Sequence, residues 1–439
     1  MKSPDTPLIS KGQSYFIFVL LFLLYLFDQA DRYVITSLFP YLQADWGLSD
    51  TQCGLLVSAV FWSLLIFTIP VSYLIDRWSR KKSIGIMAIA WSVATSICAF
   101  TSNFAQLFTA RAFIGIGEAG YASGGMAIIS GLFSEKKRGL LIGLWLASVP
   151  LGGAIGVMVG GLVAAAFGWR HAFGLVALPG LLLGILFFFT KDYKTVELVK
   201  MKQDDKQARE KTKMSSRDIA YEFVNKPSLV LNYLAYAASI FVTVALLTWL
   251  PTFFHRVENM PMAQASVKGA AVMLTAIIGA PIGGLMADRW LRKKGSARML
   301  ISGIAAMATA LVLFLSFNTE TGTLQYILLL LAGVTIAAVT PGASAVTQDL
   351  VHPGLRATSF SISTIVQHLL GSTLGPVFVG ALSDLYNIST ALSYLPIFSV
   401  VSAALFFIGS FYYDRDYEKV ERIELQIIGA DTGRNKGIA

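Results

Sequence analysis

The chain has 439 residues, of which 55% are hydrophobic and only 14% are charged, and its mean hydropathy is +0.63. Soluble domains usually carry about 25% charged residues, so this composition excludes an ordinary soluble enzyme or binding module and predicts a polytopic membrane protein. The formal net charge of +9 would suit a nucleic-acid partner. The positions of the basic residues explain it without one, and we expect no nucleic-acid ligand.

Hydropathy predicts twelve membrane-spanning helices, an even number that places both termini on one side of the bilayer. We expect an all-α membrane protein with two six-helix bundles. The predicted spans fall at about 14–42, 52–74, 83–101, 105–133, 138–167, 171–190, 228–254, 264–287, 298–317, 323–345, 356–385 and 389–412. The corresponding domains are an N-terminal bundle at 1–190, an inter-domain loop at 191–227, a C-terminal bundle at 228–412 and a tail at 413–439.

The distribution of Lys and Arg predicts the orientation of these spans. With the N-terminus inside, 30 of the 35 basic residues lie in inside segments and 3 lie in outside segments. Because inside loops are enriched in Lys and Arg, we expect cytoplasmic termini and a multi-pass protein of the bacterial inner membrane. The two basic residues that remain, Arg32 and Arg111, fall within predicted spans.

The first span carries ionisable residues deep in its hydrophobic run. Asp28, Asp31 and Arg32 lie three or four residues apart, so they share one face of a helix. A charge at the centre of a bilayer costs about 2.5–3.5 kcal/mol even on lenient scales. That face must therefore point into the protein, and we expect it to form a polar centre.

The fourth span carries the matching charges, Arg111 and Glu118, which lie seven residues apart and hence on one face. We expect Glu118 and Asp31 to converge on Arg32. In the fifth span, small residues at four-residue spacing, including Gly152, Gly156 and Gly160, predict close helix packing. The expected substrate cavity is lined by Tyr33, Asn232, Tyr233, Tyr236 and His368.

A repeated basic signature divides the chain into two halves. Residues 76–82 read DRWSRKK and residues 288–294 read DRWLRKK, at equivalent places after the second and eighth spans. An internal repeat of this kind predicts a binding site between the halves near the middle of the membrane. The charged side chains of the signature predict ion-pair latches between helix ends on the inside face: Asp76, Arg77, Arg80, Asp288, Arg289 and Arg292.

These motifs resemble the major facilitator superfamily over residues ~14–412, and that resemblance implies a transporter working by alternating access. Two of its families compete. The anion:cation symporter family shares the Asp31-Arg32 pair, Phe61-Trp62 and the sequence Gly-Glu-Ala at residue 117, and it implies small organic anions such as sugar acids. The favoured Spinster family implies an amphipathic lipid, lysolipid or sphingoid-type substrate. Its resemblance rests on Asp31-Arg32, Gly117-Glu118-Ala119, His368-Leu369-Leu370-Gly371, Gly375-Pro376 and Ser383-Asp384.

The predicted function is proton-coupled secondary transport, by symport or antiport. A buried carboxyl resists ionisation and a neighbouring Arg favours it, so Glu118 or Asp31 suits a proton carrier and Arg32 its alternating partner. A permanent ion-pair network is the structural alternative. The sequence has no phosphate-binding Gly-rich loop, no metal-ligand spacing and no nucleophile–base pattern. We therefore expect no enzyme activity, no cofactor and no metal, and we expect a monomer.

Overall fold

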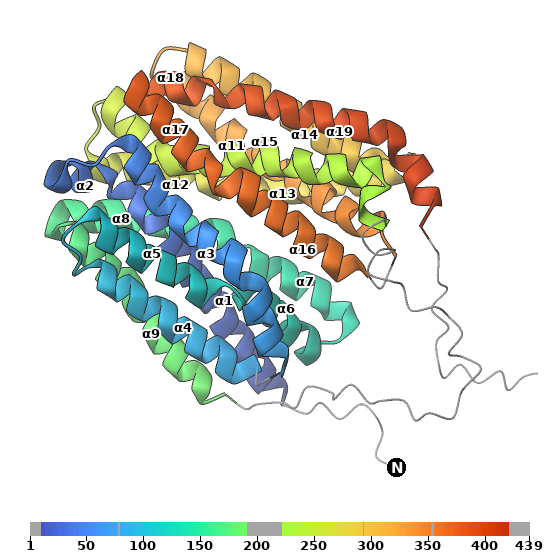
Figure 1. Cartoon of the computed structure of the whole chain (residues 1–439), viewed down its shortest axis with the longest axis horizontal. Helices are drawn as coiled ribbons and strands as arrows, with labels where there is room; N and C mark the ends of the chain where they lie inside the picture. Colours follow the sequence, from blue (N-terminus) through green and yellow to red (C-terminus); the bar gives the residue numbers. More distant parts are fainter. Residues whose placement is uncertain (1–9, 78–79, 191–221, 293, 353–354, 421–439) are drawn as a thin grey trace, which may run out of the picture.

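The computed structural model describes residues 10–77, 80–190, 222–292, 294–352 and 355–420, with the side chains of 72–77, 80, 123, 135, 136 and 357 outside this description. Every element in Figure 1 is helical. The helices of the first half are α1 (Lys11–Val34), η1 (Ile35–Ser37), α2 (Phe39–Trp46), α3 (Asp50–Arg77), α4 (Arg80–Cys98), α5 (Phe104–Glu118), α6 (Tyr121–Leu132), α7 (Glu135–Leu146), α8 (Ser148–Phe167) and α9 (Trp169–Phe188). Those of the second half are α11 (Pro227–Val257), α12 (Met262–Leu274), α13 (Ala276–Leu291), α14 (Ala297–Asn318), α15 (Thr323–Asp349), α16 (Arg356–Val366), the π-helix η4 (Gln367–Ser372), α17 (Leu374–Leu385), α18 (Ile388–Ser393) and α19 (Leu395–Glu418).

Ten stretches of the described chain are long and apolar enough to cross a membrane. The prediction of twelve spans is thus met in part. The two predicted spans missing from the ten correspond to α4 and to the pair α5 and α6. α4 opens with three consecutive basic residues, and the helical run of the fourth span is interrupted at Gly120, which leaves two short helices.

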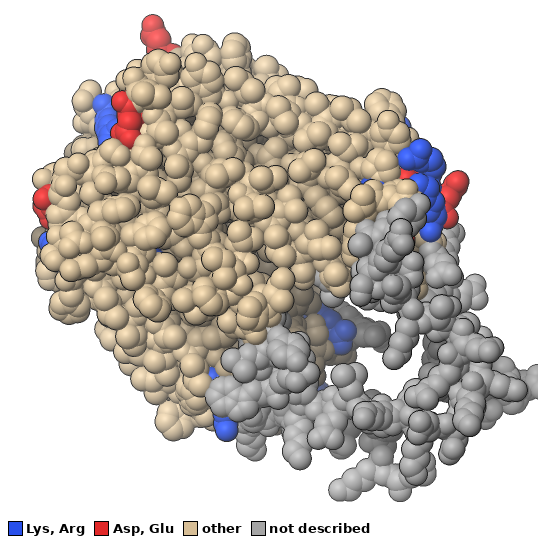
Figure 2. Space-filling view, viewed as in Figure 1, with Lys and Arg blue, Asp and Glu red and all other residues tan. Residues whose placement is uncertain are grey.

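The helices lie roughly along one direction, which gives the molecule two distinct ends (Figure 1). α2 and α18 lie at one end, called here the α2 end. α1 begins and α19 finishes at the opposite end, called here the terminal end. Figure 2 shows Lys, Arg, Asp and Glu gathered towards the ends of the visible face, with a broad band of other residues between them. That band is the surface expected for a protein surrounded by lipid tails.

Two helix pairs join the halves of the chain: α3 packs along α17, and α8 packs along α12. Towards the terminal end, Figure 2 shows a hollow in the visible face of the molecule. Among the described residues, the halves are thus joined by these helix pairs, and the visible face is hollowed at the terminal end.

Glycines of α8 fix the position of α1, the helix that carries the charged stretch. A Cβ added at Gly152 would lie 2.1 Å from the Leu26 carbonyl oxygen, and one at Gly156 would lie 2.1 Å from that of Ala30. No real side chain fits at such distances, so only glycine lets the two backbones meet. The structure confirms the predicted packing role of these residues, and α1 is held against α8 on both sides of Asp28.

Candidate functional site

Arg32 joins two helices at the middle of the first half. Its Nη2 lies 2.6 Å from Glu118 Oε2 on α5 and 3.4 Å from Asp28 Oδ2, one turn earlier on α1. Gln29 Nε2 also donates to Asp28 Oδ2, at 2.7 Å. Glu118 is fully buried at its side chain, whereas the Arg32 side chain is 13% exposed. Arg32 is thus the member of this ion-pair group with the most exposed side chain.

Asp31 has a different partner from the one predicted. Its carboxylate accepts a hydrogen bond from the Thr95 hydroxyl on α4, and the ion pairs of Arg32 within the described chain go to Asp28 and Glu118. Asp28 and Asp31 are three residues apart and therefore differ by about 60° around the helix. This difference directs Asp28 towards Arg32 and Glu118 and directs Asp31 towards α4.

Arg111 stabilises the end of α1. It is fully buried, and it donates to the carbonyl oxygens of Asp31 at 3.2 Å, Arg32 at 3.1 Å and Leu56 at 3.2 Å. The last carbonyls of a helix lack intrahelical partners, and α1 ends at Val34 before the tighter helix η1. Arg111 thus supplies the missing donors and fixes the backbone that carries Asp31 and Arg32.

The polar centre, made of these five ionisable residues, is unbalanced in charge and in hydrogen bonds. It contains three carboxyl groups and two guanidinium groups. One oxygen of each carboxyl, from Asp28, Asp31 and Glu118, accepts no hydrogen bond from the described residues. A buried carboxylate without partners is costly, so the arrangement favours uptake of a proton or of a cationic group.

Phe61 of α3 connects the polar centre to the second half of the chain. The Arg32 guanidinium carbon lies 5.6 Å from the centre of the Phe61 ring, and the His368 ring stacks on the same phenyl ring at 5.7 Å. His368 belongs to η4 and its Nδ1 is 3.3 Å from Ser372 Oγ. Short π-helical turns often occur at functional sites, and here the turn brings the predicted His368 onto the Phe61 ring that Arg32 also approaches.

The other predicted cavity residues are distributed unevenly. Tyr33 lies between the halves, where its ring packs on Gly153 and near Met273. Asn232 donates to the Ala343 carbonyl, and the Tyr233 hydroxyl bonds Ser359, so both connect helices of the second half to each other. The structure does not bring these two residues to Arg32. Tyr236, the third predicted cavity residue on α11, is buried and forms a hydrogen bond with Thr340.

Comparison with known proteins identifies the family. A family model described as Major Facilitator Superfamily matches residues 21–376. Protein spinster homolog 3 of Danio rerio is 30% identical over 401 residues, which cover 87% of this chain and 79% of that protein. The chain is a Spinster-family transporter of the Major Facilitator Superfamily.

Other relatives agree with this assignment. The sphingosine-1-phosphate transporter SPNS2 of Xenopus tropicalis is 27% identical over 90% of this chain and 81% of its own length. A solved bacterial homologue of the human lysosomal transporter Spinster, described as inward-facing and occupied, superposes with a TM-score of 0.80 at 22% identity. The superposition covers 93% of this chain and 99% of that one, and at this identity it supports the fold alone.

The predicted latch residues of this Spinster-family chain fall into two groups. The side chains of Asp76, Arg77 and Arg80 lie outside the described residues. In the second half, Asp288 is 3.3 Å from Arg298, which also pairs with Asp349 at 2.5 Å. Arg289 and Arg292, the remaining two, are exposed and make no ion pair with a described residue.

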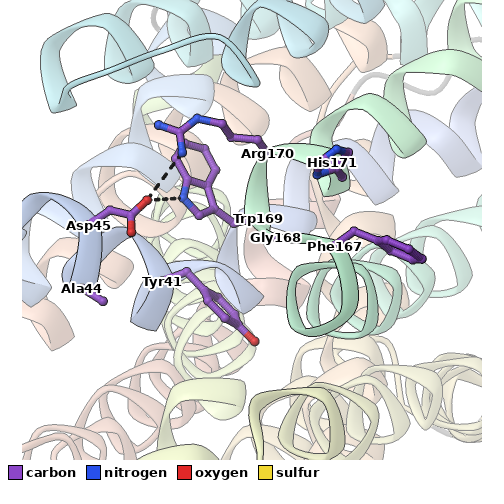
Figure 3. A pocket seen from close by; sticks show the side chains of 8 residues that line it. All are labelled: Tyr41, Ala44, Asp45, Phe167, Gly168, Trp169, Arg170 and His171. Atoms are coloured by element: carbon purple, nitrogen blue, oxygen red, sulfur yellow. Dashed lines mark hydrogen bonds and ion pairs between the residues drawn. The ribbon is translucent and has the colours of Figure 1, made fainter.

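A separate cavity of about 410 Å³ opens at the α2 end, within the first half (Figure 3). Asp45 faces its rim, where the carboxylate accepts from Trp169 Nε1 at 2.7 Å and lies 3.5 Å from Arg170 Nη1. The cavity is remote from the polar centre. Among the described residues, no group of His, Cys, Asp and Glu side chains has the arrangement of a metal site.

Three members of the site were missed in the sequence. Phe61, Thr95 and Gln29 contact the predicted charged residues directly. Each is a common residue type in a membrane helix, and its importance depends on which helix lies opposite. Phe61 carried a partial signal, because the Phe61-Trp62 pair entered the comparison of families, but nothing in the sequence placed its ring beside both Arg32 and His368.

Proposed function

We propose that this protein is a proton-coupled transporter that moves an amphipathic lipid, of the lysolipid or sphingoid type, by alternating access. The observation that supports the proposal most directly is the polar centre. Its buried carboxyls outnumber its arginines, and each carboxyl keeps an oxygen that no described residue hydrogen-bonds. Intramembrane ionisable groups of this kind usually serve transport.

The coupling step is a competition for Arg32. When Glu118 is ionised, it holds the guanidinium in the 2.6 Å ion pair. When Glu118 takes up a proton, Arg32 is released and becomes available to an anionic headgroup at its exposed side. Asp31, held by Thr95, is the second candidate for the proton. The two protonation states of Glu118 thus correspond to two different sets of Arg32 partners.

Two observations favour a lipid-type substrate over a small sugar acid. The relatives include transporters named for sphingosine-1-phosphate, which joins a phosphate to a long apolar chain. Near Arg32, the aromatic ring of Phe61 provides an apolar surface directly beside the cationic group. A phosphate or carboxylate on Arg32 and an alkyl chain along apolar helix faces would satisfy both features.

The topology completes the proposal. α4 and the pair α5 and α6 act as the remaining two spans, which gives twelve spans in two six-helix bundles at 1–190 and 228–412. The excess of basic residues in the predicted inside segments supports a terminal end that faces the cytoplasm of a bacterial cell. Asp288 and its counterpart Asp76 act as latches at that end, and Tyr33, Tyr236 and His368 line the cavity.

The decisive experiment is uptake into proteoliposomes under an imposed pH gradient. A radiolabelled lysophospholipid or sphingoid phosphate should accumulate, and a sugar acid should not. Glu118→Gln imitates the protonated form, so this variant should bind and exchange substrate while losing gradient-driven accumulation. The matched control is Glu258→Gln, which removes a carboxylate paired with Lys268 in the second half.

The proposal would be contradicted by either of two results. If the lipid accumulates to the same level with and without the pH gradient, transport is not coupled to protons. If the sugar acid accumulates in place of the lipid, the proposed lipid-type substrate is wrong. If Glu118→Gln still accumulates lipid in response to the gradient, the proton is carried by another group, and Asp31→Asn is the next variant to measure.

A further inference from the structure

A seam between α3 and α17 joins the two halves over several turns. A Cβ added at Gly54 would lie 2.5 Å from the Pro376 carbonyl oxygen, and one at Gly380 would lie 2.5 Å from that of Asp50. The two glycines therefore face the partner backbone from opposite sides of the seam. Deeper in the protein, Ser58 Oγ donates to the Thr373 carbonyl at 2.6 Å.

Asp50 lies at the α2 end of this seam, and both of its carboxylate oxygens accept hydrogen bonds. Arg256 of the second half donates to both oxygens, at 2.7 Å each. Gln43 donates to Oδ1 at 2.6 Å and Ser383 donates to Oδ2 at 2.5 Å. A bidentate Arg–carboxylate pair with additional donors is among the strongest polar contacts in proteins, and this one crosses between the halves.

Asp384 makes the reciprocal contact. Its carboxylate accepts the backbone N–H of Asp50 at 2.7 Å and of Thr51 at 2.9 Å, together with the Thr51 hydroxyl at 2.6 Å. A carboxylate at the first turn of a helix stabilises it through the unpaired N–H groups and the helix dipole. A residue of the second half thus caps the first turn of a helix of the first half.

The seam leads from this cluster to the polar centre. Ser58 bonds the residue that follows η4, and one turn further along α3 Phe61 stacks on His368 of η4 and lies beside Arg32. A change at Arg32 can therefore reach the α2 end through two elements, α3 and η4, that are in direct contact.

We propose that the Asp50 cluster, made of Gln43, Asp50, Arg256, Ser383 and Asp384, is the lock that holds the α2 end closed. Gly54 and Gly380 allow the backbone contact on which the lock closes. Opening this end separates Asp50 from Arg256 and uncaps α3. The inference deepens the proposed alternating-access function and rests on it.

A native thiol reports on the lock. Cys53 is fully buried, one turn from Asp50 in α3. In a Cys98→Ser background, it is the only cysteine of the chain. We would reconstitute this protein in lipid nanodiscs and measure the rate at which a membrane-impermeant maleimide labels Cys53. Asp50→Asn and Arg256→Gln should each increase that rate about tenfold, because each removes the bidentate pair.

Two further variants separate opening of the seam from loss of folding. Gly54→Ala keeps all charges and forces the backbones apart, so it should also accelerate labelling. The exchange Asp50→Arg with Arg256→Asp restores an ion pair and should return the rate to within about twofold of the parent. Asp45→Asn, which changes a carboxylate at the same end bonded within the first half, should leave the rate unchanged.

The proposal is overturned if Asp50→Asn, Arg256→Gln and Gly54→Ala all label within twofold of the parent, or if the charge exchange labels as fast as the single variants. Labelling does not depend on substrate. A protein whose Cys53 responds as expected but which shows no pH-driven uptake would therefore retain the lock and lose the proposed transport function.

Discussion

The polar centre and the Asp50 cluster are both built from buried carboxyls and arginines, yet they differ in how completely they are paired. In the Asp50 cluster, both oxygens of Asp50 and both oxygens of Asp384 accept hydrogen bonds. In the polar centre, each of the three carboxyls has one oxygen that accepts no hydrogen bond from the described residues. A fully paired carboxylate is stable in its charged form. An incompletely paired one is poised to change its protonation state or its partner.

This difference assigns separate tasks to groups that look alike in the sequence. Ionised carboxyls of the Asp50 cluster hold the two halves together at the α2 end. Those of the polar centre lie inside the first half, where protonation can release Arg32 without breaking any contact between halves. Burial alone does not separate the two behaviours, since Asp50 is 4% exposed and Asp28 is 1% exposed.

The largest effect is expected from Arg32→Ala. Removing one partner of a buried ion pair costs about 3–5 kcal/mol, and here the loss leaves both Glu118 and Asp28 without a cation. We expect the initial rate of lipid uptake into proteoliposomes to fall by at least about 100-fold, since about 1.4 kcal/mol corresponds to a factor of ten. Arg32→Lys, which keeps the charge, should retain part of the rate. Uptake within threefold of the parent for Arg32→Ala would remove the polar centre from the mechanism.

Gly156→Val tests whether the polar centre depends on the position of α1. A side chain at this residue would collide with the Ala30 carbonyl oxygen, and overpacking of this kind typically costs about 1–3 kcal/mol. We expect a clear decrease in the melting temperature of the purified protein. Gly143→Val in α7 is the control, because a Cβ there meets nothing within 4 Å. Equal melting temperatures for the two variants would show that α1 tolerates displacement.

The helix positions and part of the polar centre could be predicted from the sequence, because both follow from local patterns. Hydrophobic runs locate the helices, and the spacing of Asp28 and Arg32 places their side chains on one face. The pairing of Arg32 with Glu118 followed from the cost of an isolated charge in lipid. Span counting was less secure, since the break at Gly120 and the basic start of α4 leave two expected spans below the usual length or hydropathy.

Other contacts between distant segments could not be predicted. Arg256 is 206 residues from Asp50, and Asp384 is 334 residues from the Asp50 backbone that it caps. Arg111 was expected in the polar centre on the same helix face as Glu118, but its bonds to three backbone carbonyls could not be foreseen, because α1 ends in the middle of its hydrophobic run. The spacing of residues along the sequence does not show where a helix ends within an apolar run. It also does not show which helix packs against it.

Phe61→Leu examines the connection between the two clusters. The substitution keeps an apolar side chain and removes a cation–π contact with Arg32 and a stacking contact with His368, which together are worth about 1–2 kcal/mol. We expect substrate uptake to slow by about tenfold. Trp62→Leu is the matched control, because that neighbouring side chain is exposed. Equal uptake rates in the two variants would break the proposed connection.

The smallest effect is expected at the terminal end, from Asp288→Asn. Asp288 pairs with Arg298, as Asp50 pairs with Arg256. The Asp288 side chain, however, is 70% exposed, and it lies 3.3 Å from the Arg298 guanidinium. Exposed ion pairs contribute about 0–1 kcal/mol, and Arg298 keeps its closer partner Asp349. We expect uptake to change by less than about threefold and Cys53 labelling to stay at the parent rate. Asp349→Asn, which removes the 2.5 Å pair between Asp349 and Arg298, should have the larger effect of the two.

The contradicting result is an Asp288→Asn variant whose Cys53 is labelled as fast as that of Asp50→Asn. Solvent exposure would then not explain why one ion pair is weak and the other strong. The terminal end would then control closure of the α2 end from the far side of the molecule.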